Sequence, residues 1–198
     1  MYIYYTKKGK FETKEWQDIP TKELISTEKL PSIIWPNGNK EWYVNNKHHR
    51  MTGPAIVIVN SHIAWKKNGK LHRLDGPAVI GIRGNKEWYQ NGKLHRIDGP
   101  AIIIEHSGKW LIKKWLVHNK LHREDGPAVS YATGAKEWWI NGKLHRLDGP
   151  AILSNTRGYI WAINGKKINA KEVNQWIKKY NIDLKTKVHQ ALFMLRFG

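Results

Sequence analysis

The chain has 198 residues, with 34 lysines and arginines against 16 aspartates and glutamates, and its formal net charge is +18. It contains no cysteine, which excludes disulfides and thiolate metal sites and suits a reducing compartment. No apolar run is long enough to span a membrane, and the N-terminus lacks the pattern of a secretory signal, so we expect a cytoplasmic protein. A charge excess of this size attracts polyanions, although it also serves solubility.

The first part of the chain predicts an N-terminal cap over residues 1–29. The stretch "YIYY" at 2–5 is typical of a strand, and "TKELIS" at 21–26 is a short helical candidate. Residues 1–34 hold six basic and five acidic residues, whereas residues 35–168 hold 22 and nine. The positive charge therefore lies mainly beyond the cap, in residues 35–168.

A repeated unit fills residues 30–168. Each full copy contains "GPA", a β-branched run, a turn with glycine, "KEW" plus an aromatic residue, "NGK" and "LHRxDG". The motif proline recurs at steps of 23, 23, 23, 27 and 23 residues, at Pro31, Pro54, Pro77, Pro100, Pro127 and Pro150. A fixed period of this length indicates a repeat array.

The Asn-Gly step in the unit predicts a two-residue type I′ hairpin, because both turn positions need a positive φ. In the third unit this turn lies at Asn91 and Gly92. Extending the pairing outward from the turn predicts four facing pairs: Gln90 with Lys93, Tyr89 with Leu94, Trp88 with His95, and Glu87 with Arg96.

Five copies pair a tryptophan with a histidine seven residues later, and this row allows two interpretations. It could stack bases and move protons, or each histidine could pack against its facing tryptophan. The sixth copy favours the structural interpretation, because Ile168 stands opposite Trp161 where the other copies have histidine. Equivalent histidines lie about 10 Å apart, too far to share a metal ion, so we expect no metal site and no cofactor.

The recurring "HRxDG" contains residue types that occur in phosphodiester chemistry. An enzyme needs one asymmetric site, however, and a motif repeated along the chain is more typical of a turn, with the arginine pairing with the aspartate two residues on. No nucleophile with a base is visible. We therefore expect a protein without catalytic activity, and a phosphodiesterase or nuclease is the weaker alternative.

The predicted pairing divides the arginines into two classes. Arg50, Arg96 and Arg146 would face glutamates across their hairpins. Arg73 would face Ala64 and Arg123 would face Lys114, so these two would be free to contact an anion or to point into solvent. The candidate ligand-binding residues are Arg73, Arg123, Lys70, Lys93, Lys109, Lys113, Lys114, His95 and His122.

The last part of the chain predicts a helical cap over residues 169–198. Asn169 is a suitable N-cap, and apolar residues follow at helical spacing, at Val173, Trp176, Ile177 and Tyr180. A second helix is expected over residues 185–195. Terminal units of an array must cover an exposed edge, so we expect these helices to cap the last hairpin, with partner docking as the alternative.

The 23-residue period and the string "W-x-x-N-G-K-x-H" resemble MORN-type repeats, from which "HRxDGPA" departs where that family usually has a histidine followed by Gly-x-Gly. The longer "KEWYxNGKLHRxDGPA" is similar to repeats in proteins of tailed phages and large DNA viruses. The resemblance implies an all-β fold, an elongated array of five to six MORN-like β-hairpin repeats between the N-terminal and C-terminal caps.

These observations predict a basic repeat protein that binds a phosphate-bearing ligand, either nucleic acid or a nucleotide. The viral resemblance implies a factor that sequesters a host or defence molecule in the host cytoplasm. Two further alternatives stay open: a scaffold for an acidic partner protein, and a peripheral binder of anionic lipid.

Overall fold

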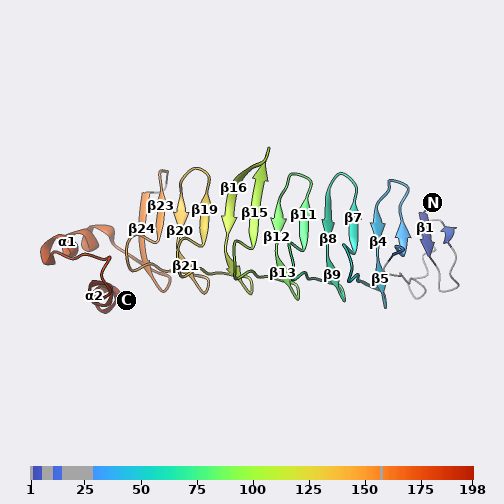
Figure 1. The fold of residues 1–198 in the computed structure, drawn as a ribbon. Helices are drawn as coiled ribbons and strands as arrows, with labels where there is room; N and C mark the ends of the chain where they lie inside the picture. The colour runs from blue at the N-terminus through green and yellow to red at the C-terminus, as the bar shows by residue number, and fades with distance from the viewer. Residues whose placement is uncertain (1, 6–10, 15–28, 157) are drawn as a thin grey trace. The chain divides into compact units, whose positions relative to one another are not determined.

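The computed structural model describes residues 2–5, 11–14, 29–156 and 158–198 of the chain (Figure 1). The fold is mostly β: a long antiparallel sheet of repeated hairpins, several small two-stranded sheets, and two C-terminal helices. The predicted all-β repeat fold is thus confirmed, and so is the predicted N-terminal strand, β1 (Tyr2–Tyr5). The helical candidate at 21–26 lies outside the described residues.

The chain divides into two compact units. Unit 1 comprises Met1–His95 and Glu105–Gly108, and unit 2 comprises Arg96–Ile104 and Lys109–Gly198. The strand order of the long sheet is β2-β1-β3-β4-β7-β8-β11-β12 in unit 1 and β16-β19-β20-β23-β24-β25 in unit 2. In both units successive hairpins follow one another in chain order (Figure 1).

Each repeat builds two hairpins, one in the long sheet and one in a small sheet, except that both hairpins of the last repeat belong to the long sheet. The long-sheet strands are β2 (Phe11–Lys14), β3 (Ile33–Ile34), β4 (Lys40–Glu41), β7 (Ile56–Ile58), β8 (His62–Ala64), β11 (Val79–Gly81), β12 (Lys86–Glu87), β15 (Ile102–His106), β16 (Lys109–Lys114), β19 (Val129–Tyr131), β20 (Lys136–Glu137), β23 (Ile152–Ser154), β24 (Gly158–Ile163) and β25 (Lys166–Ile168). The small hairpins pair β5 (Tyr43–Val44) with β6 (Lys47–His48), β9 (Lys66–Lys67) with β10 (Lys70–Leu71), β13 (Tyr89–Gln90) with β14 (Lys93–Leu94), β17 (Leu116–Val117) with β18 (Lys120–Leu121), and β21 (Trp139–Ile140) with β22 (Lys143–Leu144).

The Asn-Gly turns lie where the sequence predicts them. At the tip of the third small hairpin, Asn91 has φ 52° and Gly92 has φ 80°, as a type I′ turn requires. In the fourth repeat His118 and Asn119 take the same conformation without a glycine, with φ 48° and 68°. The predicted pairs Tyr89 with Leu94 and Gln90 with Lys93 are confirmed, and the His95 N–H donates to the Trp88 carbonyl at 3.0 Å.

The pairing predicted beyond the tryptophan is wrong. Glu87 belongs to the long sheet, where it pairs with Val79, and not with Arg96. Past the histidine the chain crosses to the next repeat, so the Arg73 N–H donates to the Tyr89 carbonyl at 3.1 Å. In each repeat the tryptophan and histidine therefore form the last pair of the small hairpin. The residues before the tryptophan pair in the long sheet instead.

The other predicted partners of the arginines are corrected for the same reason. Ala64 pairs with Val79 in the long sheet, and Lys114 pairs with Val129. Neither residue faces an arginine in the sheet. The four extra residues of the fourth repeat lengthen its long-sheet hairpin, since β15 has five residues and β16 has six.

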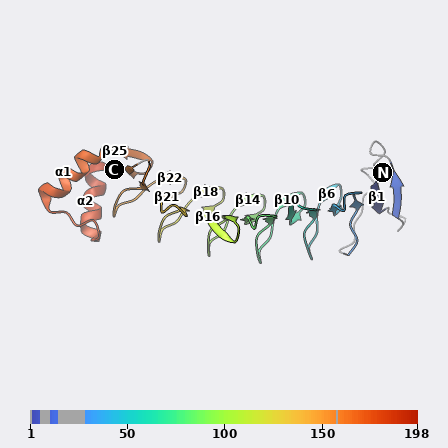
Figure 2. The same ribbon diagram turned by 90° about the horizontal axis from the view of Figure 1, so that it is seen from above.

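Two helices, α1 (Ala170–Tyr180) and α2 (Lys187–Phe197), cover the last hairpin, as predicted (Figure 2). The Asn169 side chain caps α1 by accepting N–H bonds from Lys171 and Glu172. The second helix starts two residues later than expected, because Thr186 caps it. The helices contribute Val173, Phe193 and Phe197, and the segment between them contributes Leu184, to a buried cluster with Trp161 and Ile163 of β24.

Candidate anion-binding groove

The arginines of the "HRxDG" turns all donate to the aspartate two residues on and to the proline carbonyl, and Arg73, Arg123 and Arg146 also lie over a tryptophan ring. The Arg73 guanidinium lies over the Trp65 ring, 4.0 Å from its centre, while its Nε donates to Asp75 at 2.9 Å and its Nη1 donates to the Pro77 carbonyl at 3.4 Å. Arg123 and Arg146 repeat these contacts with the tryptophan, aspartate and proline of their own repeats. The predicted division into neutralised and free arginines is therefore wrong.

The glycine of each turn leaves room for the guanidinium. A Cβ on Gly76 would lie 3.0 Å from the Arg73 Cζ, and a Cβ on Gly99 would lie 2.8 Å from the Arg96 Cζ. Both distances are shorter than ordinary contacts. The "HRxDG" motif is thus a turn in which arginine, aspartate and glycine each have a structural role, which agrees with its interpretation as turn chemistry.

The glutamates of the "KEW" motif bind aromatic donors. Glu87 accepts a hydrogen bond from the Tyr89 hydroxyl at 2.9 Å. Burial and this bond raise the pKa of Tyr89 to about 12. Glu41 accepts bonds from Trp35, Tyr43 and His48; burial alone would raise its pKa, but these bonds hold the pKa of Glu41 below its ordinary value.

The histidines link one repeat to the next, which supports their structural interpretation. The Asn91 N–H donates to Nδ1 of His72 at 3.2 Å. The same bond, with the same length, joins His49 to Asn68, His122 to Asn141 and His145 to Asn164. Of the two histidines predicted to bind ligand, His122 holds the next turn and His95 is only 7% exposed.

The candidate lysines fall into two groups. Lys70 and Lys93 occupy exposed positions after the turns of small hairpins, and the Lys70 stem packs on Gly92 of the next repeat. Lys109, Lys113 and Lys114 lie on β16, where the Lys113 Nζ is 4.6 Å from the centre of the Trp110 ring. The predicted site residues thus occur in both units, and whether they bind a ligand stays a prediction.

A groove of about 400 Å³ runs between the first two complete turns of unit 1. Its charged lining consists of Arg50, Lys67, Arg73 and Asp75, and His72 and Trp65 also face it. Among the described residues that line it, three are basic and one is acidic. We call it the basic groove.

Two features of the sequence give the basic groove its charge. Thr52 follows Arg50 at the place where the later turns have aspartate, and a second lysine precedes the Asn-Gly turn at position 67. Lys67 lies directly opposite Lys70 across the small hairpin, and both are exposed. Like charges placed opposite each other destabilise a strand pair, so an anion at this position would relieve a local repulsion.

An equivalent groove of about 490 Å³ lies in unit 2, between the turns at 123–126 and 146–149. The charged residues that line it are Arg123, Arg146, Lys187, Glu124, Asp125 and Asp148. Three basic and three acidic side chains face each other here, so we call it the neutral groove. Ile140 stands at the position that Lys67 has in the basic groove.

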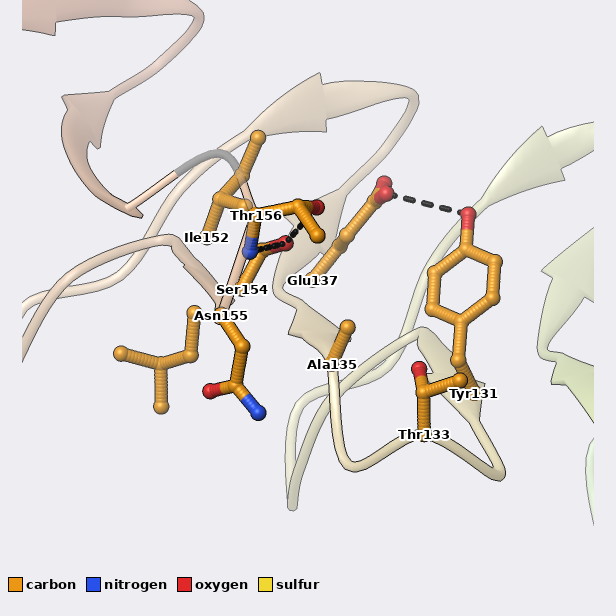
Figure 3. A pocket seen from close by; sticks show the side chains of 9 residues that line it. Tyr131, Thr133, Ala135, Glu137, Ile152, Ser154, Asn155 and Thr156 are labelled. Atoms are coloured by element: carbon orange, nitrogen blue, oxygen red, sulfur yellow. Dashed lines mark hydrogen bonds between the residues drawn. The ribbon is translucent and has the colours of Figure 1, made fainter.

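A third cavity, of about 260 Å³, lies on the long sheet in unit 2 (Figure 3). Its only charged residue among the described lining is Glu137, which accepts hydrogen bonds from Tyr131 at 3.2 Å and from Trp139 at 2.9 Å. Its other polar lining residues include Thr133, Ser154, Asn155 and Thr156. A carboxylate without a basic neighbour in the lining does not suit a phosphate.

Sequence reasoning found Arg73 but missed Arg50 and Lys67, which the structure places in the same groove. The signals were present, since Thr52 interrupts the "HRxDG" pattern and the doublet Lys66–Lys67 precedes an Asn-Gly turn. Their effect on the charge of a site depends on the two turns lining one groove, which the sequence does not show.

Neither a family model nor a curated protein matches this chain in the comparisons made with known proteins. Among the described residues, no three side chains of histidine, cysteine, aspartate or glutamate are grouped so as to hold a metal ion. In the same part of the chain, no helix has the length and apolarity needed to cross a lipid bilayer.

Proposed function

We propose that this protein binds a phosphate-bearing ligand, a nucleotide or a segment of single-stranded nucleic acid, in the basic groove of unit 1. The observation that carries the proposal is the charge of this lining, with Arg50, Lys67 and Arg73 against Asp75. The neutral groove has the same backbone plan and lacks this excess. A positive charge at one particular repeat is a stronger sign of a site than the +18 of the whole chain.

The shape of the basic groove suits such a ligand. Its volume of about 400 Å³ falls within the ordinary range for small-molecule sites. Trp65 and the guanidinium of Arg73 form a stacked aromatic and cationic pair. Guanidinium planes and aromatic rings both stack on bases, so a phosphate could pair with Lys67 while a base lies near Arg73.

Lys67 is the residue to test, because it is exposed and lies opposite Lys70 on a small hairpin. Lys67→Ala therefore removes a charge without opening a cavity. We expect the variant to bind a fluorescein-labelled oligothymidylate and a nucleoside triphosphate about tenfold or more weakly, because charge-assisted hydrogen bonds to phosphate are among the strong ones.

The matched control is Lys143→Ala. Lys143 is an exposed lysine of a small hairpin in unit 2, and its removal lowers the net charge by the same amount. It should leave binding nearly unchanged, and only Lys67→Ala should give a shallower dependence of the logarithm of affinity on the logarithm of salt concentration. Equal losses in both variants would show that only the overall charge matters.

A second part of the proposal concerns the type of repeat and the role of the protein. We infer that the hairpin repeats are of the MORN type and related to those of phage and large-virus proteins, and that the protein acts without catalysis in the host cytoplasm, where it sequesters a phosphate-bearing host or defence molecule. The repeat period and the "KEWYxNGKLHRxDGPA" string support this inference. A small-molecule extract that yields a nucleotide by mass spectrometry would strengthen it.

A further inference from the structure

Helix α2 has apolar residues on two opposite faces. Phe193 and Phe197 point into the buried cluster over the last hairpin and are 0% and 9% exposed. Val188, Leu192 and Leu195 are instead 70%, 43% and 84% exposed. A helix that covers a hairpin needs only the first of these faces.

The exposed residues form one continuous stripe. They stand at positions i, i+4 and i+7, which fall on the same side of an α-helix at about 100° per residue. Single exposed apolar residues are common on protein surfaces, but an aligned row on one helix is typical of a docking face. We call Val188, Leu192 and Leu195 the α2 stripe.

The α2 stripe lies between two basic residues of its own helix. Lys187 and Arg196 flank it on its two sides at helical spacing, and α2 contains no aspartate or glutamate. The nearest acid in the sequence is Asp183, which precedes the helix and whose backbone N–H donates to Nδ1 of His189. The surface therefore offers an apolar row between two basic residues, each of which shares a cavity lining with acidic residues of the chain: Lys187 with Asp148, and Arg196 with Glu172.

We propose that the α2 stripe docks an acidic amphipathic segment of a partner protein, which lays its apolar face on Val188, Leu192 and Leu195 and sets its carboxylates against Lys187 and Arg196. Charge complementarity selects this occupant over a second copy of the chain. An antiparallel pair of α2 helices would bring Lys187 of one copy near Arg196 of the other, and each copy has a net charge of +18.

The test uses the full chain and a labelled synthetic helix of 18 residues, with leucines at i, i+3, i+4 and i+7 and glutamates on the other positions. We expect fluorescence polarisation to show binding of this peptide. Leu192→Ser with Leu195→Ser should weaken it about tenfold or more, because exposed apolar anchors in the centre of such a contact dominate its affinity. Both leucines are exposed, so an unchanged melting temperature should show that the variant is folded.

Two controls separate this surface from the basic groove. A peptide with lysines in place of glutamates should bind at least about tenfold more weakly, since it loses the attraction to Lys187 and Arg196. Lys67→Ala should leave binding of the acidic peptide unchanged, and the α2 double variant should leave oligothymidylate binding unchanged.

Three results would overturn the proposal. The first is equal binding of the acidic peptide to the wild-type protein and to the folded α2 variant. The second is equal binding of the acidic and basic peptides. The third is sedimentation equilibrium that shows a dimer of the wild-type chain which the α2 variant dissociates, because the stripe would then belong to a second copy.

Discussion

The basic and neutral grooves occupy the same place in two different repeats, yet they differ in charge. A tryptophan lines each groove, Trp65 in one and Trp138 in the other. The Cζ atom of an arginine lies over each ring, 4.0 Å from the ring centre of Trp65 and 3.7 Å from that of Trp138. The basic groove has three basic and one acidic side chain in its described lining, and the neutral groove has three of each. The scaffold is therefore common to both, and a few lining positions decide what each groove can bind.

Two of the lining positions that differ lie outside the set of contacts that recurs in the turns, and a third is the aspartate of that set, which is Thr52 in the basic groove and Asp125 in the neutral groove. Arginine, aspartate and glycine of the turn hold one another and the tryptophan, so most turns have all of them. The residue between arginine and aspartate, and the residue before the Asn-Gly turn, do not belong to this set. Met51 and Lys67 occupy these positions around the basic groove, and Glu124 and Ile140 occupy them around the neutral groove.

The largest effect on stability should come from removing the tryptophan that lines each groove. Trp65→Ala and Trp138→Ala should each destabilise the protein by about 3 kcal/mol, because each removes a large ring and the surface on which an arginine lies. Denaturant unfolding measures this loss. Only Trp65→Ala should also abolish binding of oligothymidylate under conditions where both variants are folded. Lost binding in folded Trp138→Ala would place the ligand elsewhere.

The next effect comes from converting the neutral groove into a basic one. Glu124→Met, Asp125→Thr and Ile140→Lys together give unit 2 the lining residues of the basic groove. We expect isothermal titration calorimetry to find two sites for a nucleoside triphosphate where the natural chain has one. The new site should bind at least about tenfold more tightly than the neutral groove, a change of about 1.4 kcal/mol.

The converted groove has its own control in Ile140→Lys alone. This change adds one positive charge but leaves both Glu124 and Asp125 in the lining, so it should give a weaker second site or none. If the single change binds as tightly as the triple change, the acids of the turn do not exclude ligand. If neither binds, the charge of the lining is not what selects the ligand.

The comparison also shows how far sequence could predict this fold. The Asn-Gly step, the spacing of Trp88 and His95, and the cap at Asn169 are local signals, and each gave the right element because its partners lie within a few residues. The partner of Glu87 could not be found in this way. Its strand has two residues and pairs with Val79 of the long sheet, eight positions earlier, which is about the separation of Trp88 and His95. Extending the pairing outward from the Asn-Gly turn assigned Glu87 to the wrong strand, because the small hairpin ends at Trp88.

The candidate site was predictable only in part, for a related reason. The sequence indicated a basic array and singled out Arg73, but the grouping of Arg50, Lys67 and Arg73 arises from two successive turns placed side by side. A single repeat contains no such groove. The structural role of the histidine row was predicted from the sixth copy, where Ile168 replaces histidine, but as packing against tryptophan; the bond from Asn91 to His72 in the next repeat was not predicted.

The smallest effect concerns the acid of the basic groove. A hydrogen bond and the charge of Arg73 hold the pKa of Asp75 below its ordinary value of 3.8, so the ionised form stabilises the folded state. This contribution is present above pH 3.8 and is lost as the pH falls through the lowered pKa. Asp75→Asn lacks it at every pH, so its unfolding free energy should fall less steeply than that of the natural chain between about pH 4 and pH 2.

Although Asp75→Asn removes a stabilising ion pair from the folded state, it should strengthen ligand binding. At neutral pH it removes the carboxylate from a lining that then has three basic side chains, so a nucleoside triphosphate should bind about threefold more tightly.

Asp125 has the same bond to its arginine, and its pKa is lowered for the same reason, but it lines the neutral groove. Asp125→Asn should therefore reproduce the altered acid unfolding and leave the affinity of the natural site unchanged. Tighter binding in both variants would mean that the ligand responds to the total charge of the chain, and the distinction between the two grooves would then have no bearing on function.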